Sequence, residues 1–311
     1  MSKILGIDTS NYTTSAAILD TESMEIKQSK MLLPVKHGEK SLRQSDAVFH
    51  HTKQIPLVLK DLLSDFSGEL DGIGVSVKPR PVSGSYMPCF LTGQAVAESI
   101  GLVQNIRPDF TSHQTGHILA ALYSCGKLDL IINKIPFIAF HVSGGTTDML
   151  LCRPDEKEIL NIELIGTALD LNAGQVIDRT GVMLGLGFPC GEELEKLAEK
   201  SSVAYKVKPT MKGMNCCLSG IENQCRKLYE AGESSENIAG FCIASISAAI
   251  YKMTVLAADK YGEMPFIYAG GVMSNKIISG NLKRGYFAEP DFSKDNAAGA
   301  AVFSAVRKGL I

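Results

Sequence analysis

Two histidines stand four residues apart in the segment HQTGH, residues 113–117. On a helix, side chains four residues apart lie on one face, so both imidazole rings can reach the same ion. Imidazole suits Zn²⁺ and Fe²⁺, and a carboxylate commonly completes such a ligand set. The alternative is a pair of ordinary polar residues on a helix surface. The spacing favours a metal site.

A zinc protease of the HExxH type needs a glutamate directly after the first histidine, where it activates water. Gln114 stands at that position, which makes proteolysis a poor interpretation. Of the other histidines, His50 and His51 are adjacent and cannot share one helix face, and His37 falls in a loop-like stretch. We interpret these three as surface residues or as local hydrogen-bonding residues.

Three turns rich in small and polar residues follow apolar segments that we predict to be strands. They are residues 9–14, 143–147 and 270–271. Backbone amides in such turns converge on phosphate oxygens, and glycine permits the close approach and positive φ that this requires. Plain structural turns are the alternative. Three such turns in one chain favour a nucleotide site.

The elements around these turns predict a layered α/β protein. Residues 3–19 and 138–151 each form a predicted hairpin, and this approximate repeat suggests two related lobes. Apolar residues at helical spacing mark helices near 55–63, 194–198 and 238–259. We expect an N-terminal lobe of residues 1–107, joined by about 297–311. A C-terminal lobe, residues 108–296, would carry the metal and nucleotide loops.

Composition places the chain among ordinary globular proteins, with 45% hydrophobic and 21% charged residues over 311 positions. A net charge of −2 gives no global attraction to nucleic acid, so any RNA contact needs a local basic patch. The eight cysteines form no CxxC pair, which favours reduced thiols and an intracellular protein. The apolar stretch 238–258 carries Lys252 and serines, so we predict a buried helix, no membrane partner and a cytoplasmic location.

The turns resemble those of a known superfamily. HVSGGTTD, residues 141–148, resembles the second phosphate loop of the actin, hexokinase and Hsp70 ATPases. IDTSNYTTSAAI resembles their first loop, and YAGGVMSN their adenosine-side loop. The resemblance implies a two-lobed, ribonuclease H-like α/β ATPase fold with the ligand cleft between the lobes.

An ordered set of motifs narrows the resemblance further. GIDTS, the histidine pair, VSGG, ALDLNAGQVIDRTGVMLGLGFPCG, GGVMSN and KDNAAGAA occur in the order typical of the TsaD family, also known as Gcp. Its members were formerly called O-sialoglycoprotein endopeptidases, and the family forms threonylcarbamoyladenosine beside the tRNA anticodon. The match spans essentially the whole chain and is more specific than any motif alone.

Residue by residue, the resemblance implies a metal site and a nucleotide site. The implied metal ligands are His113, His117 and Asp295, with His141 as a candidate fourth in a slot where some members have tyrosine. The implied nucleotide contacts are Ser143, Gly144, Gly145, Thr146, Asp178, Gly191, Gly270, Gly271 and Asn275. The implied ligands are ATP, AMP or threonylcarbamoyl-adenylate, one Fe or Zn ion, and Mg²⁺ as a further candidate at the phosphates.

The sequence departs from the family closest to the transfer chemistry. In the family, the first turn carries an acidic pair that is thought to serve the transfer chemistry, and Tyr12 and Thr13 replace it here. Asp8, Tyr12 and Thr13 are therefore our candidate catalytic residues. Thr146 replaces a histidine, Leu171 and Gln175 replace acids, and Arg80 replaces a glycine. Neither tyrosine nor threonine accepts a proton near neutral pH as a carboxylate does. The nucleotide and metal scaffold is therefore retained while the transfer chemistry is altered.

Three functions compete. The first is the family acyltransferase, which moves a threonylcarbamoyl group from its adenylate to tRNA adenosine with metal assistance, with tRNA and TsaB-like accessory proteins as partners. The second is a diverged nucleotide- and metal-binding paralogue that serves another substrate or regulates a partner. The third, a small-molecule kinase, leaves the histidine pair unexplained and ranks last. The sequence indicates no oligomeric state.

Overall fold

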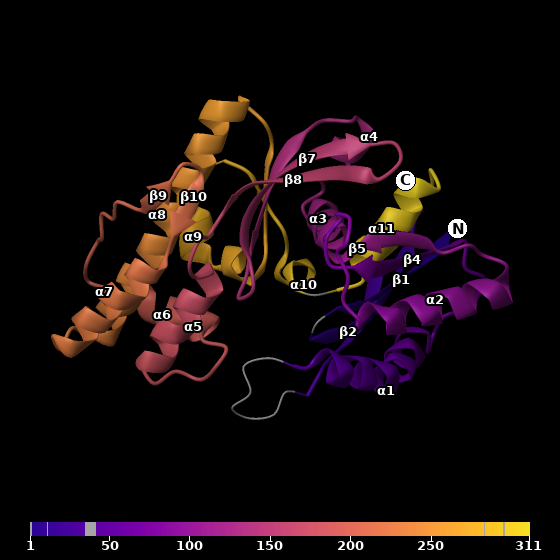
Figure 1. Cartoon of the computed structure of the whole chain (residues 1–311), viewed down its shortest axis with the longest axis horizontal. Coiled ribbons are helices and arrows are strands. Elements are labelled where there is room, and N and C mark those ends of the chain that lie inside the picture. The colour runs from indigo at the N-terminus through magenta and orange to yellow at the C-terminus, as the bar shows by residue number, and fades with distance from the viewer. Residues whose placement is uncertain (1, 11, 35–41, 283, 295) are drawn as a thin grey trace. The chain divides into compact units, whose positions relative to one another are not determined.

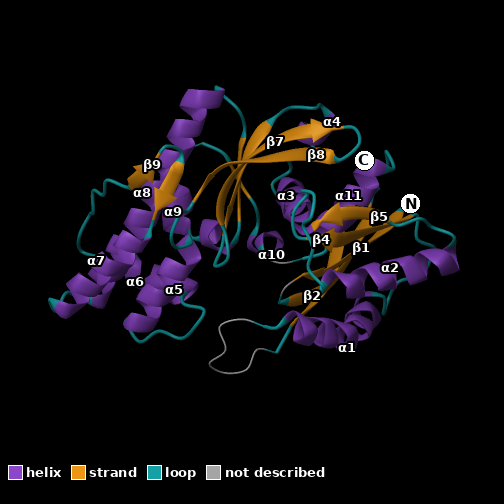
Figure 2. Cartoon of the chain, viewed as in Figure 1, coloured by secondary structure: helices purple, strands orange, loops and turns teal. Residues whose placement is uncertain are grey.

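The computed structural model describes residues 2–10, 12–34, 42–282, 284–294 and 296–311. The chain divides into two compact units, each with its own sheet and helices (Figures 1 and 2). The first unit comprises Met1–Asn133, Pro154–Asn161 and Lys294–Ile311, and the second comprises Lys134–Arg153 and Ile162–Ser293. The first unit runs past the predicted boundary at residue 107, so the histidine pair lies in the N-terminal unit.

The first unit is a five-stranded sheet in the order β3-β2-β1-β4-β5. Its strands are β1 (Lys3–Ser10), β2 (Thr13–Asp20), β3 (Ile26–Leu32), β4 (Gly72–Lys78) and β5 (Asp109–Ser112). Its helices are α1 (Gln44–Leu62), α2 (Phe90–Gln104), α3 (His113–Ser124), α4 (Asp129–Ile132) and α11 (Ala298–Arg307). Apolar side chains of β1, β2 and β4 pack against α1 and α2, where Leu5, Ile7, Ile55 and Val58 are buried.

The second unit has its own five-stranded sheet, in the order β12-β11-β6-β7-β8, and a separate hairpin of β9 and β10. Its strands are β6 (Phe137–Val142), β7 (Thr147–Asp155), β8 (Ile159–Thr167), β9 (Thr210–Lys212), β10 (Asn215–Cys217), β11 (Phe266–Ala269) and β12 (Tyr286–Phe287). The last two residues of β7 and the first three of β8 are counted with the first unit. Its helices are α5 (Ala173–Met183), α6 (Gly191–Ala198), α7 (Ser219–Glu230), α8 (Ser235–Tyr261), η1 (Gly271–Ser274), α9 (Lys276–Asn281) and α10 (Pro290–Ser293).

The two large sheets repeat one topology. In the first, β1 pairs antiparallel with β2 and parallel with β4; in the second, β6 pairs antiparallel with β7 and parallel with β11. The order β3-β2-β1-β4-β5 therefore corresponds to β8-β7-β6-β11-β12. The predicted repeat of two hairpins is part of this larger correspondence.

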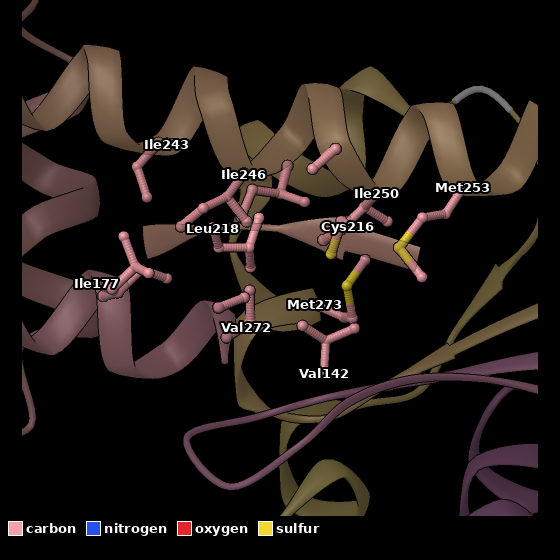
Figure 3. Close-up of a cluster of buried hydrophobic side chains, with 14 of the residues drawn as sticks. Val142, Ile177, Cys216, Leu218, Ile243, Ile246, Ile250, Met253, Val272 and Met273 are labelled. Atoms are coloured by element: carbon pink, nitrogen blue, oxygen red, sulfur yellow. The ribbon is translucent and has the colours of Figure 1, made fainter. Parts of the chain in front are cut away.

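Helix α8 is the core of the second unit. Its inner face buries Ile243, Ile246, Ile250 and Met253 against residues of α5, β10 and η1 (Figure 3). By length and composition alone it is the one helix among the described residues that could cross a membrane, yet 56% of its most apolar window is buried. Its apolar character is therefore explained by packing inside this unit.

Helix α11 packs so closely on the first sheet that no side chain fits between the helix backbone and the strands at the contact points. A Cβ atom built on Gly74 would lie 1.8 Å from the Ala300 carbonyl oxygen, and one built on Gly6 would lie 2.3 Å from the Ala297 oxygen. On its other side, a Cβ at Gly299 would lie 1.8 Å from the Gly116 oxygen of α3. Glycine is needed at these positions because the space holds no side chain.

We predict that Gly74→Ala destabilises the protein by about 2 kcal/mol, because the added methyl group must displace the α11 backbone. The control is Gly220→Ala in α7, where an added Cβ meets nothing within 4 Å. That variant should be neutral or up to about 1 kcal/mol more stable, since alanine favours the helix. Urea unfolding measures both changes, and equal stabilities of the two variants would contradict the packing described for α11.

Candidate active site

The first predicted site residue, Asp8, lies near the end of β1 and is 1% exposed. Its Oδ2 atom lies 2.9 Å from Nδ1 of His113, and its Oδ1 atom accepts a hydrogen bond from the Ser10 amide at 2.9 Å. His113 is the first residue of α3, whose start is set by Ser112: the Ser112 hydroxyl accepts from the Thr115 amide at 3.1 Å. The helix cap therefore places His113 beside Asp8.

The two predicted metal histidines face each other. Nε2 of His113 lies 2.9 Å from Nε2 of His117, and the ring planes are inclined by 75°. The Asp8 carboxylate accepts the Nδ1 proton of His113, so the other ring nitrogen, Nε2, is the one that faces His117. The two Nε2 atoms thus face each other at hydrogen-bonding distance, so both rings lie on one helix face, as the spacing predicted.

This arrangement fits a transition metal. Imidazole nitrogens are suitable donors, and a carboxylate on the far nitrogen of a ligating histidine fixes its tautomer and orientation. Asp295, the predicted third ligand, lies outside the described residues. Within those residues, no group of three His, Cys, Asp or Glu side chains is gathered closely enough to hold an ion. His141 belongs to the second unit, so its role as a ligand stays a prediction.

Asp8 is held in its ionised form. Burial raises the pKa of its carboxyl group, but the charge of His113 and the hydrogen bonds from His113 and Ser10 more than offset this and lower the pKa below its usual value. A buried carboxylate committed to a histidine orients that ring. Asp8 is thus engaged in orienting His113, and a catalytic role for it stays a prediction.

Tyr12 and Thr13, the residues that replace the family's acidic pair, lie at the β1–β2 turn. Tyr12 is half-buried, and its carbonyl oxygen accepts from the Leu33 amide at 2.8 Å. Thr13 is 5% exposed and pairs with Ser10. Paired residues of antiparallel strands point to the same side, and alternation puts Asp8 there too. Thr13 therefore lies on the sheet face that carries Asp8.

His51 differs from our interpretation of it as a surface or locally bonded residue, because it is fully buried. Its Nδ1 lies 2.8 Å from the Thr14 hydroxyl, which also donates to Gln54 at 2.8 Å. Burial lowers the pKa of His51 to about 4, so the ring is neutral. It ties α1 to the β1–β2 hairpin. The signal we missed is helical spacing with Ile55, Val58 and Leu62, the buried face of α1.

In the second unit, the predicted phosphate turn joins β6 to β7. The Ser143 hydroxyl accepts from the amides of Gly145 and Thr146, both at 3.2 Å. It also lies 2.8 Å from the Thr146 hydroxyl. Two backbone amides are thus aimed at one acceptor position, which a phosphate oxygen can occupy in place of the hydroxyl. Gly144 and Gly145 are exposed and have open space beside them.

The predicted nucleotide residues are joined by a closed series of contacts within this unit. A Cβ on Gly174 of α5 would lie 2.6 Å from the Gly144 nitrogen, and one on Gly270 would lie 2.2 Å from the Val142 oxygen. Asp178 of α5 accepts from the Cys190 amide at 2.9 Å, next to Gly191. Glu195 of α6 accepts from the Lys276 amide at 2.6 Å, next to Asn275. The unit therefore gathers residues from four separate segments.

The glycines of the two turns differ in their role. Gly270 has a φ of +99° and is crowded by Val142, so glycine is required there. Gly144, Gly145 and Gly271 have no left-handed φ, so the expected conformational need is not what the structure shows at these three. Their lack of a side chain leaves room on the open side of each turn.

Two of the predicted nucleotide contacts, Asn275 and Asp178, accept hydrogen bonds from backbone amides of the protein. The Asn275 side chain caps α9, since its Oδ1 accepts from the Ile278 amide at 3.0 Å. Asp178 is half-buried, and its desolvation raises the pKa of the carboxyl group despite the Cys190 hydrogen bond. Gln175, which stands where the family has an acid, accepts from the Asn172 amide at 3.1 Å and so stabilises the start of α5. Sequence reasoning missed this capping role of Gln175.

Solved structures with a similar fold cover the whole chain. Component A of (R)-2-hydroxyglutaryl-CoA dehydratase from Acidaminococcus fermentans gives a TM-score of 0.58 at 15% identity, over 100% of this chain and 99% of that one. A glucokinase from Streptomyces griseus gives 0.53 at 10% identity, over 98% and 100%. Full-length HypF gives 0.60 at 14% identity, over 99% and 46%. The mixed α/β fold is that of the actin, hexokinase and Hsp70 class of ATPases, as predicted.

Sequence comparison resolves the family within this class. The model of the tRNA N6-adenosine threonylcarbamoyltransferases, TsaD, matches residues 44–302, and the chain belongs to this family. A member from Francisella philomiragia is 28% identical over 98% of this chain and 94% of its own length. One from Aromatoleum aromaticum is 27% identical over 98% and 91%. The predicted family is confirmed.

For the metal, we predict that replacing His113 and His117 together by alanine abolishes binding of the single ion expected per chain. Asp8→Asn should weaken binding about 10- to 100-fold, because the ligand His113 loses its orienting carboxylate. His50→Ala is the matched control and should keep full metal content. Elemental analysis and metal titration of purified protein measure these effects. Full occupancy in the double variant would contradict the assignment.

For the nucleotide, we predict that Asp178→Ala lowers ATP affinity about 10- to 100-fold, the typical value of a hydrogen bond to a charged group. Asp178 also holds the Cys190 amide, so Asp178→Asn is the matched control: it keeps an acceptor for that amide but removes the charge. Calorimetry should place its affinity between those of the wild type and the alanine variant. Wild-type affinity in a folded alanine variant would remove Asp178 from the site.

Proposed function

We propose that this protein is a tRNA N6-adenosine threonylcarbamoyltransferase that transfers its acyl group slowly. Family membership supports the reaction class, and the observation that carries the proposal is the pair His113–His117 oriented by buried Asp8. His113, His117 and Asp295 would hold one Fe or Zn ion, with His141 as a candidate fourth ligand. Such an ion supplies Lewis acidity toward a carbonyl oxygen.

The chain's own residues would bind and orient the donor. The amides of Gly145 and Thr146 offer two aligned donors to the phosphate of threonylcarbamoyl-adenylate, where Mg²⁺ remains a candidate. Asp178 and Asn275 would contact its nucleoside. Such fixed donors stabilise the negative charge that grows on a departing phosphate without reorganisation. ATP and AMP would bind the same residues.

The reaction forms one bond and breaks one. The N6 amine of the tRNA adenosine attacks the carbamoyl carbonyl carbon, the bond from that carbon to the phosphate oxygen breaks, and AMP leaves. One proton must leave the amine. Asp8 is committed to His113, and the two carboxylates that the family has at positions 12 and 13 are absent from this chain. The proton must therefore go to the departing phosphate or to water, which explains the slow rate we propose.

The replaced acids also favour a second candidate, a diverged nucleotide- and metal-binding protein with another acceptor or a regulatory role. Thr146, in place of the family's histidine, points the same way. Both candidates would work in the cytoplasm, and the transferase would bind tRNA and draw on TsaB-like accessory proteins. Only the transferase predicts product on tRNA.

We predict that the wild type forms threonylcarbamoyladenosine about 10²- to 10⁴-fold more slowly than a family member with the acidic pair, the usual effect of losing one general acid or base. Tyr12→Asp with Thr13→Glu should raise the rate. Thr13 is buried on the Asp8 face, so a glutamate there could prevent folding. A second variant therefore changes only the half-buried Tyr12, as Tyr12→Asp.

The assay supplies threonylcarbamoyl-adenylate and tRNA, with and without an accessory TsaB-like protein, and counts modified nucleoside by mass spectrometry. Turnover at the family rate in the wild type would defeat the idea of altered chemistry. No product from the wild type or from either folded variant would favour the diverged protein.

A further inference from the structure

Residues 205–212, between α6 and α7, expose their lysines on one side. From residue 205 to 212 the chain alternates: Lys206, Lys208 and Lys212 are exposed, while the alternate residues turn inward. Tyr205, Val207 and Met211 pack against the core of the second unit. Extended backbone sends successive side chains to opposite sides, so this packing forces the three lysines outward together.

Helix α8 adds a fourth lysine to the same surface. Lys208, Pro209, Thr210, Met211 and Lys252 line an open hollow of about 670 Å³. The hairpin β9–β10 that carries this segment is fastened to the unit, because the Thr167 amide donates to Asn215 at 2.9 Å and Asp170 accepts from the Leu218 amide at 2.7 Å. We call Lys206, Lys208, Lys212 and Lys252 the lysine face.

The two segments that carry the lysine face hold no carboxylate of their own; Asp170 lies beside Leu218, and Glu233 lies near Tyr205. Residues 201–221 and 237–258 contain no Asp or Glu, so lysines are their only charged side chains. None of the four lysines forms an ion pair with a described residue. The face therefore gathers four positive charges without an ion-pair partner among the described residues, in a chain whose net charge is −2. Concentrated charge of this kind attracts polyanions.

We propose that the lysine face binds the sugar–phosphate backbone of RNA. The six residue steps from Lys206 to Lys212 span about 20 Å of extended chain, which reaches several phosphates of a nucleic-acid backbone and is too long for a single phosphate. Lysine is a point charge that contacts phosphate without reading sequence. This inference rests on the proposed function, which supplies tRNA as the RNA, and assigns its docking surface to the second unit.

The test is tRNA affinity as a function of salt, using the full chain with all four lysines changed to glutamine. Each lost phosphate contact lowers the slope of log affinity against log salt by about 0.7 to 0.9, so the slope should fall by about 3. The corresponding loss of affinity near 0.1 M salt is about 100-fold or more. ATP affinity should not change.

The matched control changes four exposed lysines elsewhere, Lys60, Lys196, Lys227 and Lys260, to glutamine and should keep the wild-type slope. Polyglutamate and inorganic phosphate serve as comparison probes. Unchanged tRNA binding in the lysine-face variant, equal losses in the two variants, or loss of polyglutamate binding alone would overturn the proposal. If the wild type binds tRNA through this face but makes no modified nucleoside, the transferase proposal fails and the lysine face stands.

Discussion

The hydrogen bond between the Asp8 carboxylate and the His113 ring is the constraint on which the candidate site depends. It joins residues 105 positions apart and connects the first strand of the sheet to the start of α3. Burying a carboxylate is costly unless it is paired, and here His113 and the Ser10 amide supply the pairing. The same bond sets the tautomer of His113 and so turns its Nε2 toward His117. The close packing of α11 on Gly74 and Gly116 supports this arrangement, because it fixes α3 against the sheet.

The second unit holds several backbone turns beside one another. Its apolar core is built around α8 and includes Val142, Val272 and Met273, which adjoin two of these turns (Figure 3). Single polar contacts then tie the segments together, with Asp178 holding the Cys190 amide and Glu195 holding the Lys276 amide. Because these side chains serve the fold as well as the proposed nucleotide, their substitution is informative only when a control keeps the structural bond.

Local patterns predicted much of this molecule. The spacing of His113 and His117 was enough to place both rings on one helix face, and the apolar hairpins were enough to suggest a repeat. Long-range pairing was not predictable, since nothing in the segment around Asp8 indicates that His113 lies beside it. His51 was misjudged because we considered only its adjacency to His50. Its helical spacing with Ile55 and Val58 places it on the buried face of α1. The glycines of the turns were assigned a common need for unusual φ, which the structure shows only at Gly270.

The metal environment is the most direct test of this arrangement, because the chain also carries eight free thiols that could compete for an ion. X-ray absorption at the metal edge of the purified full-length protein distinguishes the two ligand classes. We expect a first shell of nitrogen and oxygen only, with the outer-shell scattering of two imidazole rings. A sulfur shell at about 2.3 Å, the zinc–thiolate distance, would contradict the histidine site. So would a metal-loaded protein without imidazole scattering.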